Sequence, residues 1–374
     1  MIHHNEFWWR FFPKKELTRI YASTAVRNFA ISLIGIFIPL YLHVEQGISL
    51  QDTLLFFIFY SLIFAITAPL AAKFASYYGA KHSIFMSVPF YLAFVVLLYA
   101  LPFLDTPLVI ISSLLGLSQS FYWMGMHLVF HHASDHDHRG EEVSKRVSAA
   151  LLAGMAGPFA GGFLITYLGF KVVFALASLF LLLSALILLS SKDGHARYHF
   201  SVRSIINRKY WKNSLFFVSQ GTRVIADGVI WPLFIFIILN NYLSLGIIGS
   251  ILSGLSAVLL LVMGKYSDRH NKRKIARWAS LLDSLSWILR GLVTTVTHIY
   301  AVTILAALTT GFRESPLGAL EYDKAEGEVA SYFVSREVFI CLGRILMLTF
   351  VLMLNSLSGG LIFQGAASLA AFLF

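Results

Sequence analysis

The sequence predicts an all-α integral membrane protein with about twelve transmembrane helices in two pseudo-symmetric six-helix bundles. Three observations lead to this fold class. Of the 374 residues 57% are hydrophobic and only 13% are charged, whereas a soluble domain carries roughly 25% charged residues. The apolar residues fall in runs of about 20, the length that an α-helix needs to cross roughly 30 Å of hydrocarbon. The two halves of the chain also repeat one another.

The apolar runs define the individual spans in order. In the first half we expect helices at 21–43, 54–74, 83–101, 108–131, 147–168 and 172–190. In the second half we expect helices at 214–239, 245–264, 275–296, 300–320, 334–354 and 360–374. The chain is thereby divided into an N-terminal bundle at 1–190, a polar, basic linker at 191–212 and a C-terminal bundle at 213–374.

Basic residues gather on one side of the predicted membrane. That side carries Arg10, Lys14, Lys15 and Arg19, the 191–212 linker, and Lys272, Arg273, Lys274 and Arg277. The opposite loops hold essentially only Lys171. By the positive-inside rule both termini are cytoplasmic in a multi-pass protein of an inner or plasma membrane. The net charge of +10 is then explained without nucleic acid, with membrane lipid as the counter-charge.

The internal repeat has an offset of roughly 192 to 196 residues, as in transporter folds built from two halves. The first span contains Ser23-x-x-x-Arg27-x-x-Ala30 followed by Pro39-Leu40, and the seventh contains Ser219-x-x-x-Arg223-x-x-Ala226 followed by Pro232-Leu233. Arg27 and Arg223 therefore occupy equivalent positions, on helices expected to meet at the axis between the halves.

The segment 264–273, Gly-Lys-Tyr-Ser-Asp-Arg-His-Asn-Lys-Arg, resembles a signature of the major facilitator superfamily, G-x-L-A-D-R-x-G-R-R. The matching residues are Gly264, Asp268, Arg269, Lys272 and Arg273. The first-half copy keeps Gly79 and Lys81 but has Ser76 where the family has Asp. The resemblance implies an alternating-access transporter with a central cavity, and a conformational gate in which Asp268 approaches the start of the fifth helix near Arg146.

The fifth span contains a second resemblance, to the G-P-x-x-G-G motif of efflux antiporters in the same superfamily. It consists of Gly157, Pro158, Gly161 and Gly162. The glycines expected upstream are replaced by Ser144 and Ala153. Two interpretations stay open: a proline kink that serves antiport, or small residues that simply allow close helix packing.

Ionisable residues within the spans are functional candidates, because a charge at the bilayer centre costs roughly 2.5–3.5 kcal/mol on insertion scales. They are Arg27, Arg223, Asp227, Asp283, Arg290, Arg313, Glu314, Glu337 and Arg344. Arg223 and Asp227 are four residues apart and can pair on one helix face. Asp283 and Arg290 are seven apart, so a substrate, water or another helix joins them more easily than a direct contact.

Each candidate role has a structural alternative. Arg27 and Arg223 either bind an anionic or hydroxyl-rich group or form structural ion pairs that reach towards headgroups. Asp227 and Glu314 are the preferred protonatable carboxylates for proton coupling, with permanent salt bridges as the alternative. Gln119, Trp123 and Trp231 are candidates for substrate contact, although aromatic residues in helices also serve packing.

The sequence favours no metal or cofactor. The single cysteine, Cys341, lies in an apolar run and is expected to be a packing residue. His127, His131 and His132 have no completing ligand set in a recognisable spacing, so we expect them to face solvent or headgroups.

We therefore expect a monomeric, non-enzymatic, alternating-access secondary transporter of a small solute. Proton coupling is one option, and the fifth helix favours efflux of an amphipathic compound. The alternatives are an uptake carrier for an anion or sugar, or a non-transporting membrane protein on the same fold, such as a sensor, scramblase or assembly partner. No hydrolase, metalloprotease or phosphate-loop motif supports an intramembrane enzyme.

Overall fold

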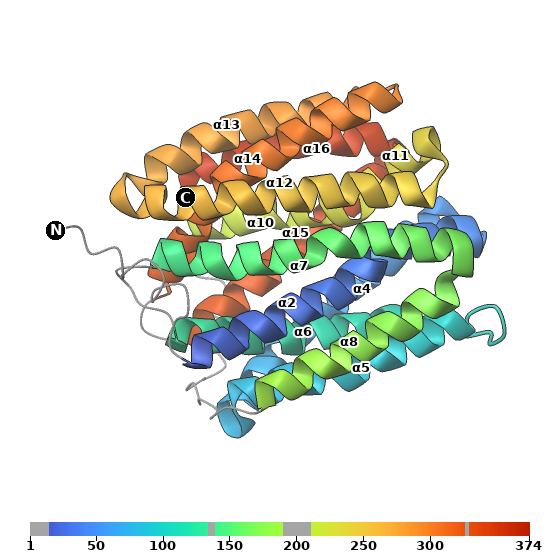
Figure 1. Ribbon diagram of the computed structural model, residues 1–374, viewed down its shortest axis with the longest axis horizontal. Helices are drawn as coiled ribbons and strands as arrows, with labels where there is room; N and C mark the ends of the chain where they lie inside the picture. Colours follow the sequence, from blue (N-terminus) through green and yellow to red (C-terminus); the bar gives the residue numbers. More distant parts are fainter. Residues whose placement is uncertain (1–14, 134–138, 190–210, 326–328) are drawn as a thin grey trace.

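The computed structural model describes residues 15–133, 139–189, 211–325 and 329–374, and these form a bundle of long helices (Figure 1). In the first half the spans are α2 (Lys15–Ile34) continued by η1 (Gly35–Phe37), α3 (Ile38–Leu40) and η2 (Tyr41–Glu45), then α4 (Leu50–Tyr78), α5 (Ala80–Ala100), α6 (Leu108–Ala133), α7 (Arg139–Leu168) and α8 (Phe170–Leu189). In the second half they are α10 (Trp211–Ile225) continued by η4 (Ala226–Ile230) and α11 (Trp231–Leu239), then α12 (Tyr242–Arg269), α13 (Lys272–Gly291), α14 (Val296–Asp323), α15 (Val329–Leu354), and α16 (Leu357–Ser368) with η5 (Leu369–Leu373).

Every predicted span is helical, so the all-α membrane fold class is confirmed. Nine of the described helical spans are long and apolar enough to cross a bilayer. The ninth, α13, instead carries charged residues along its length, the tenth, α14, carries them in its second half, and the twelfth is short. The predicted linker at 191–212 extends too far at its end, since Trp211 and Lys212 already belong to α10. Its residues up to 210 lie outside the described part.

The first and seventh spans lose regular α-helical geometry at equivalent places. Each contains a glycine four residues before a proline, Gly35 before Pro39 and Gly228 before Pro232. Proline has no N–H and its ring displaces the carbonyl four residues earlier, so the helical hydrogen bond fails there. The backbone responds with the 3₁₀ turn η1 in the first span and the π-helical turn η4 in the seventh. Irregular turns of the π type often mark functional positions in helices, and η4 contains Asp227.

The helices group by half and touch across the halves at two main seams. Within the first half α2 packs on α7 and α8, and α6 packs on α4 and α5; within the second, α14 packs on α12 and α13, and α10 packs on α15. Across the halves α7 packs along α12, as Figure 1 shows, and α4 packs along α15.

The α7–α12 seam depends on small residues. A Cβ added to Gly162 would lie 2.5 Å from the carbonyl oxygen of Tyr242 in α12, and one added to Gly246 would collide with the carbonyl of Pro158. A Cβ added to Gly161 would likewise collide with the carbonyl oxygen of Leu33 in α2. These backbones approach too closely for any side chain, as is typical of small-residue helix contacts in membranes.

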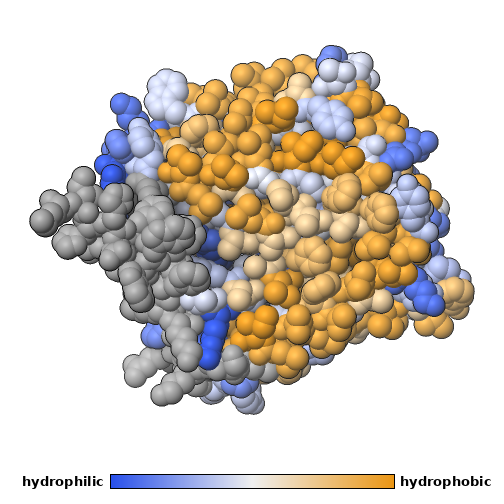
Figure 2. All heavy atoms as spheres, viewed as in Figure 1, coloured by the Kyte–Doolittle hydropathy of each residue, from blue (hydrophilic) through white to orange (hydrophobic). Residues whose placement is uncertain are grey.

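The surface agrees with a membrane location. Figure 2 shows an apolar surface across the middle of the molecule, with hydrophilic residues towards the two ends of the helices. Large apolar side chains such as Ile66, Leu70 and Leu179 are more than half exposed. We call the end that carries Lys272, Arg273, Lys274 and Arg277 the basic end, and the end that carries the α11–α12 turn the opposite end.

Candidate functional site

Six ionisable side chains of the second half converge in one network, the central charge cluster. Its members are Arg223, Asp227, Asp283, Arg290, Arg313 and Glu314, contributed by α10, η4, α13 and α14. Their formal charges cancel, three against three. Burial of so many charges in a helical membrane protein is tolerated because each one lies against an opposite charge.

Arg223 is the hub of the cluster. Its Nη1 donates to Asp283 Oδ1 at 2.6 Å, and its Nη2 donates to Thr310 Oγ1 at 2.9 Å. Its Nε lies 3.7 Å from Asp227 Oδ2 and 3.9 Å from Glu314 Oε1. The i,i+4 pair predicted for Arg223 and Asp227 is therefore present. Arg223 is only 6% exposed, so its guanidinium does not reach towards headgroups.

Asp283 is the buried anion of the cluster. Besides Arg223, it accepts a hydrogen bond from Ser368 Oγ at 3.0 Å and lies 3.8 Å from Arg313 Nε. Its exposed fraction is 2%. Two cations and a hydroxyl thus contact this carboxylate within the helix bundle, which makes it a structural anchor between α10, α13, α14 and α16.

Asp227 and Glu314 form the accessible part of the same cluster. Arg290 Nη1 donates to Asp227 Oδ1 at 2.7 Å, and Arg313 Nη1 donates to Glu314 Oε1 at 2.7 Å. The two carboxylate side chains are nevertheless 31% and 36% exposed. Gly228, next to Asp227, faces open space, since a Cβ there would meet nothing within 4 Å. Water can therefore reach these two groups, unlike Asp283.

Two buried tryptophan rings lie against Arg290. Its guanidinium lies 4.1 Å from the ring centre of Trp287 and 5.1 Å from that of Trp231. Trp231, a predicted substrate contact, is 3% exposed and thus packs on the cluster. Asp283 and Arg290, seven residues apart, do not contact each other directly, and Arg223 and Asp227 of the seventh span link them.

Arg27 and Arg344 lie apart from the central charge cluster. The guanidinium of Arg27 lies 3.5 Å from the ring centre of Tyr122, and Arg344 Nη1 donates to the hydroxyl of Tyr60 at 2.8 Å. The two arginines are 2% and 4% exposed. Among the described residues neither has a carboxylate at ion-pair distance. The repeat therefore correctly aligns Arg27 with Arg223 in sequence, but only the second-half copy is neutralised.

A second polar cluster joins the halves towards the basic end. His127 of α6 hydrogen-bonds Tyr322 of α14 through Nδ1 at 2.9 Å and Glu337 of α15 through Nε2 at 3.0 Å. Its ring stacks on Phe333 with centres 4.5 Å apart. His127 is 2% exposed, so the expectation that it faces solvent or headgroups is wrong. Hydrogen bonding to partners in the other half makes burial of this imidazole possible.

The same cluster contains two residues that sequence reasoning did not select as candidates, Arg336 and Glu321. Arg336 pairs with Glu321 at 2.8 Å and with the neighbouring Glu337. These residues lie on two helices, α14 and α15, that the sequence gives no means of pairing. The available signal was the adjacent charge pair Arg336-Glu337 within an otherwise apolar run. Trp123, another predicted substrate contact, stacks on His127 at 5.6 Å, and Gln119 lies one helical turn further along the same face of α6.

A chain of serines closes the basic end between α7, α14 and α12. Ser144 Oγ donates to Ser315 Oγ at 2.8 Å, and Ser267 Oγ lies 3.1 Å from Ser315 Oγ. Val143 packs where a Cβ on Gly318 would stand. In the described part of the chain, Ser267, which precedes Asp268, is connected to Ser144 at the start of the fifth helix only through Ser315 of α14. The Asp268 side chain itself lies outside the described residues, and its predicted contact stays a prediction.

The remaining motif residues lie around the helix turns at the basic end. Gly79 has φ = 104°, a conformation that glycine adopts easily, and it separates α4 from α5. Lys81, at the start of α5, is 2% exposed. Lys272 Nζ donates to Asp323 Oδ2 at 3.0 Å, which ties the start of α13 to the end of α14. Arg269 and Arg273 are exposed, and Gly264 is buried in α12.

The opposite end is closed by aromatic contacts around Tyr242. Its hydroxyl donates to Glu45 Oε1 at 2.6 Å, and its ring lies 6.3 Å from that of Phe37 and 5.7 Å from that of Phe170. Glu45, Phe37 and Phe170 belong to the first half and Tyr242 to the second. The halves therefore touch at both ends of the molecule, with the charge clusters between.

The glycine–proline segment of the fifth helix serves packing. Gly157 lies against Ser32, and Gly161 and Gly162 allow the backbone approaches described above. Pro158 lies within α7, which runs without interruption from Arg139 to Leu168. Close packing accounts for these contacts, and a role of the segment in antiport stays a prediction.

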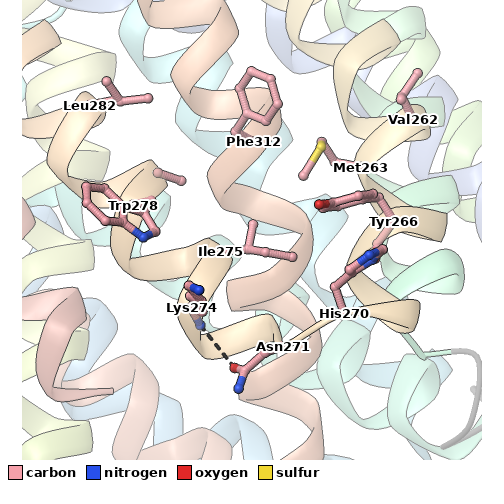
Figure 3. A pocket seen from close by; sticks show the side chains of 11 residues that line it. Val262, Met263, Tyr266, His270, Asn271, Lys274, Ile275, Trp278, Leu282 and Phe312 are labelled. Atoms are coloured by element: carbon pink, nitrogen blue, oxygen red, sulfur yellow. Dashed lines mark hydrogen bonds between the residues drawn. The ribbon is translucent and has the colours of Figure 1, made fainter.

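A groove of about 720 Å³ on the outside of α12, α13 and α14 is separate from these clusters (Figure 3). Its walls are apolar side chains, and its polar residues His270, Asn271 and Lys274 lie at the basic end. Phe312 lines this groove, and Glu314, two residues further along α14, points to the other side of the helix. The ionisable candidates thus belong to the interior and not to the groove.

Taken together, a bundle of long helices, nine of whose described spans can cross a bilayer, with buried ionisable residues is typical of membrane transporters. Residues 20–219 match the model of the Major Facilitator Superfamily, which is more than half of the chain. The protein belongs to this superfamily.

Individual proteins are similar to this chain in sequence or in fold. Protein YqgE of Bacillus subtilis (strain 168) is 25% identical over 319 residues, which cover 79% of this chain and 72% of YqgE. Among solved structures, a POT family transporter in complex with a thioalcohol-conjugated peptide superposes with a TM-score of 0.75 at 11% identity, over 97% of both chains. The human organic anion transporter MFSD10 gives 0.69 at 12% identity, over 96% of this chain and 98% of that one. A bacterial homologue of ferroportin in an outward-facing state gives 0.69 at 11% identity, over 96% and 97%. These structural likenesses show the fold.

Proposed function

We propose that this protein is an alternating-access secondary transporter of a small solute, with its basic end in the cytoplasm. The observation that carries the proposal is the pair of closures between the halves, the serine and His127 contacts at the basic end and the Tyr242 contacts at the opposite end. Each closure consists of a few side-chain contacts that can separate without unfolding either half. Rocking of one half against the other would open one end while the other stays closed.

The accessible carboxylates support proton coupling as part of this function. Asp227 and Glu314 share Arg223 with the buried Asp283, so protonation of either one changes the balance of charge around that guanidinium. A change in this balance alters how strongly α10 is held against α14. Protonation can in this way be linked to movement between helices of the second half.

A disulfide lock tests the alternating-access mechanism. In a Cys341→Ala background, Ser144→Cys and Ser315→Cys place two thiols where the serine hydroxyls are 2.8 Å apart. In proteoliposomes, oxidation of the double variant should abolish uptake of any solute that the unlocked protein accumulates from a labelled panel, and reduction should restore it. The single Ser144→Cys variant should respond to neither reagent. Continued uptake with the lock closed would contradict the mechanism.

Spin labels placed across each end make the test independent of the solute. For a transporter, the distance across one end should lengthen as the distance across the other shortens when pH or solute is varied. If the spin-label distances at both ends stay unchanged, a non-transporting protein on this fold is favoured instead.

Glu314→Gln tests the coupling. The variant should fold, since this side chain is 36% exposed, but its uptake should no longer respond to an imposed pH gradient. Arg277→Gln, an exposed change on α13, is the control and should leave the response intact. An unaltered pH response of Glu314→Gln would remove Glu314 from the coupling pathway.

A further inference from the structure

Among the described residues, two buried arginines have no carboxylate at ion-pair distance, and Glu337, two helical turns from Arg344 on α15, acts on Arg344 only at longer range. Arg27 of α2 and Arg344 of α15 belong to opposite halves, are 2% and 4% exposed, and have no carboxylate partner among the described residues. Nε of both side chains and Nη2 of Arg27 are buried without a hydrogen-bond acceptor. The arginines of the central charge cluster, in contrast, each donate to or lie beside a carboxylate.

The surroundings of the two arginines are aromatic and hydroxyl-bearing. Arg27 lies over the ring of Tyr122 at 3.5 Å. Arg344 donates to Tyr60 and lies 5.1 Å from the ring centre of Phe64. Aromatic faces attract a cation but do not neutralise it, and they leave the in-plane N–H groups of the guanidinium free to donate.

The two arginines are linked through tyrosines. Tyr60 of α4 accepts the hydrogen bond from Arg344, and Tyr91 of α5 lies near enough to interact electrostatically with both Tyr60 and Arg27. α4 packs along α15 across the seam between the halves. A ligand bound by both arginines would therefore contact both halves, which is where a rocking transporter holds its solute.

We propose that Arg27 and Arg344 together bind the negatively charged group of the transported solute, an organic anion with a carboxylate or phosphate. Removing a cation from water without an ion-pair partner is costly, and binding of an anion recovers part of this cost. Their flat, paired donors suit the two oxygens of a carboxylate or phosphate. The surrounding rings of Tyr60, Tyr91 and Tyr122 suit an apolar or aromatic body on the same solute.

The proposal rests on the proposed transporter function and specifies its substrate class. It also separates the roles of the two repeat-related arginines. Arg223 is neutralised within its own half and serves the coupling cluster, whereas Arg27 is left for the solute.

The first test is the thermal stability of the ligand-free protein in detergent. Arg27→Gln and Arg344→Gln should leave the melting temperature unchanged or raise it, because each removes a buried charge that has no carboxylate at ion-pair distance among the described residues. Arg290→Gln, which leaves Asp227 without its closest cation, should lower it. Equal destabilisation by Arg27→Gln and Arg290→Gln would show that Arg27 is a structural residue and would overturn the proposal.

The second test measures anion binding by the shift in melting temperature at constant ionic strength. The probes are sodium salts of carboxylates from acetate to naphthoate and of phosphates from methyl to naphthyl phosphate, each compared with its neutral amide or alcohol. At least one anion should stabilise the wild-type protein where its neutral analogue does not. The shift should be lost in Arg27→Gln and Arg344→Gln, reduced in Arg27→Lys, and kept in Arg277→Gln.

Three outcomes would overturn the proposal. They are stabilisation by neutral analogues alone, an anion shift that survives in both arginine variants, and stabilisation by phosphatidylglycerol alone, which would indicate a lipid site. If a neutral or cationic solute is transported and the disulfide lock still stops its uptake, the substrate class is wrong and the transporter function stands. If the lock and the spin-label distances show no alternation, the transporter function itself fails.

Discussion

Asp283 and Glu314 are carboxylates of one cluster with opposite surroundings, and the difference predicts opposite effects of mutation. Asp283→Asn should reduce stability by about 3–5 kcal/mol, because it removes the buried anion between Arg223 and Arg313 and leaves them only the partly exposed carboxylates of the cluster. Glu314→Gln should cost far less, since water reaches the Glu314 side chain. Thermal unfolding of the two purified variants in the same detergent measures the difference. Equal losses of stability in the two variants would show that water does not stabilise Arg223 and Arg313 when the charge of Glu314 is removed.

The single residues show which contacts a sequence can and cannot specify. The pairing of Arg223 with Asp227 follows from their spacing of four on one helix. The stronger contact of Arg223, with Asp283, joins two helices sixty residues apart in the chain, and no local pattern encodes it. His127 was misjudged for the same reason, because its partners Tyr322 and Glu337 come from the other half. The sequence shows which charged residues lie within apolar spans, but the packing of the helices determines which of these residues pair.

At the scale of elements, the helices follow from hydropathy but their ends do not. An apolar run ends where the membrane ends, whereas α7 and α12 continue beyond the predicted spans as polar helix. The irregular turns η1 and η4 follow from the glycine–proline spacing in each half. The small residues of α7 predict that this helix packs closely against another helix. They do not predict that the partner is α12, because α12 belongs to the other half of the chain.

The seam predicts a difference between two glycines of the same helix. Gly162→Ala should destabilise the protein and weaken the contact of α7 with α12, because the new Cβ would stand 2.5 Å from the carbonyl oxygen of Tyr242. Gly154→Ala is the matched control, since its Cβ would lie 3.8 Å from Ser32, an ordinary contact distance. Melting temperatures of the two variants test this. A Gly162→Ala protein as stable as Gly154→Ala would mean that the seam relaxes freely.

The contact of α6 with α14 and α15 gives a second prediction at this scale. His127→Phe keeps an aromatic ring against Phe333 but removes the hydrogen bonds to Tyr322 and Glu337. Loss of about 2 kcal/mol from the closure would raise the population with the basic end open by roughly 30-fold. Spin-label distances across the basic end should lengthen accordingly. The control is His132→Phe, an exposed histidine on the same helix, which should change nothing; an unchanged distance in His127→Phe would show that His127 does not hold this end closed.

At the scale of the whole molecule, the two closures act on one equilibrium. If opening of one end requires closing of the other, the population of each state depends on the difference between the free energies of the two closures, and not on either alone. The repeat in the sequence predicts the two halves and the axis between them. It does not predict this balance, because the closures use unrelated residues, histidine and serines at the basic end and Tyr242 with Glu45 at the opposite end.

If the two closures act on one equilibrium, a mutation that weakens the closure at one end should offset the population shift caused by a mutation that weakens the other closure. Tyr242→Phe removes the 2.6 Å hydrogen bond to Glu45 while the ring contacts with Phe37 and Phe170 remain, so the opposite end should open more often. His127→Phe shifts the population the other way, and the double variant should therefore return towards the wild-type distances at both ends. Tyr167→Phe, an exposed tyrosine on α7, should have no effect. If the double variant instead opens both ends at once, the closures are independent, and the two halves do not move as the rigid bodies that alternating access requires.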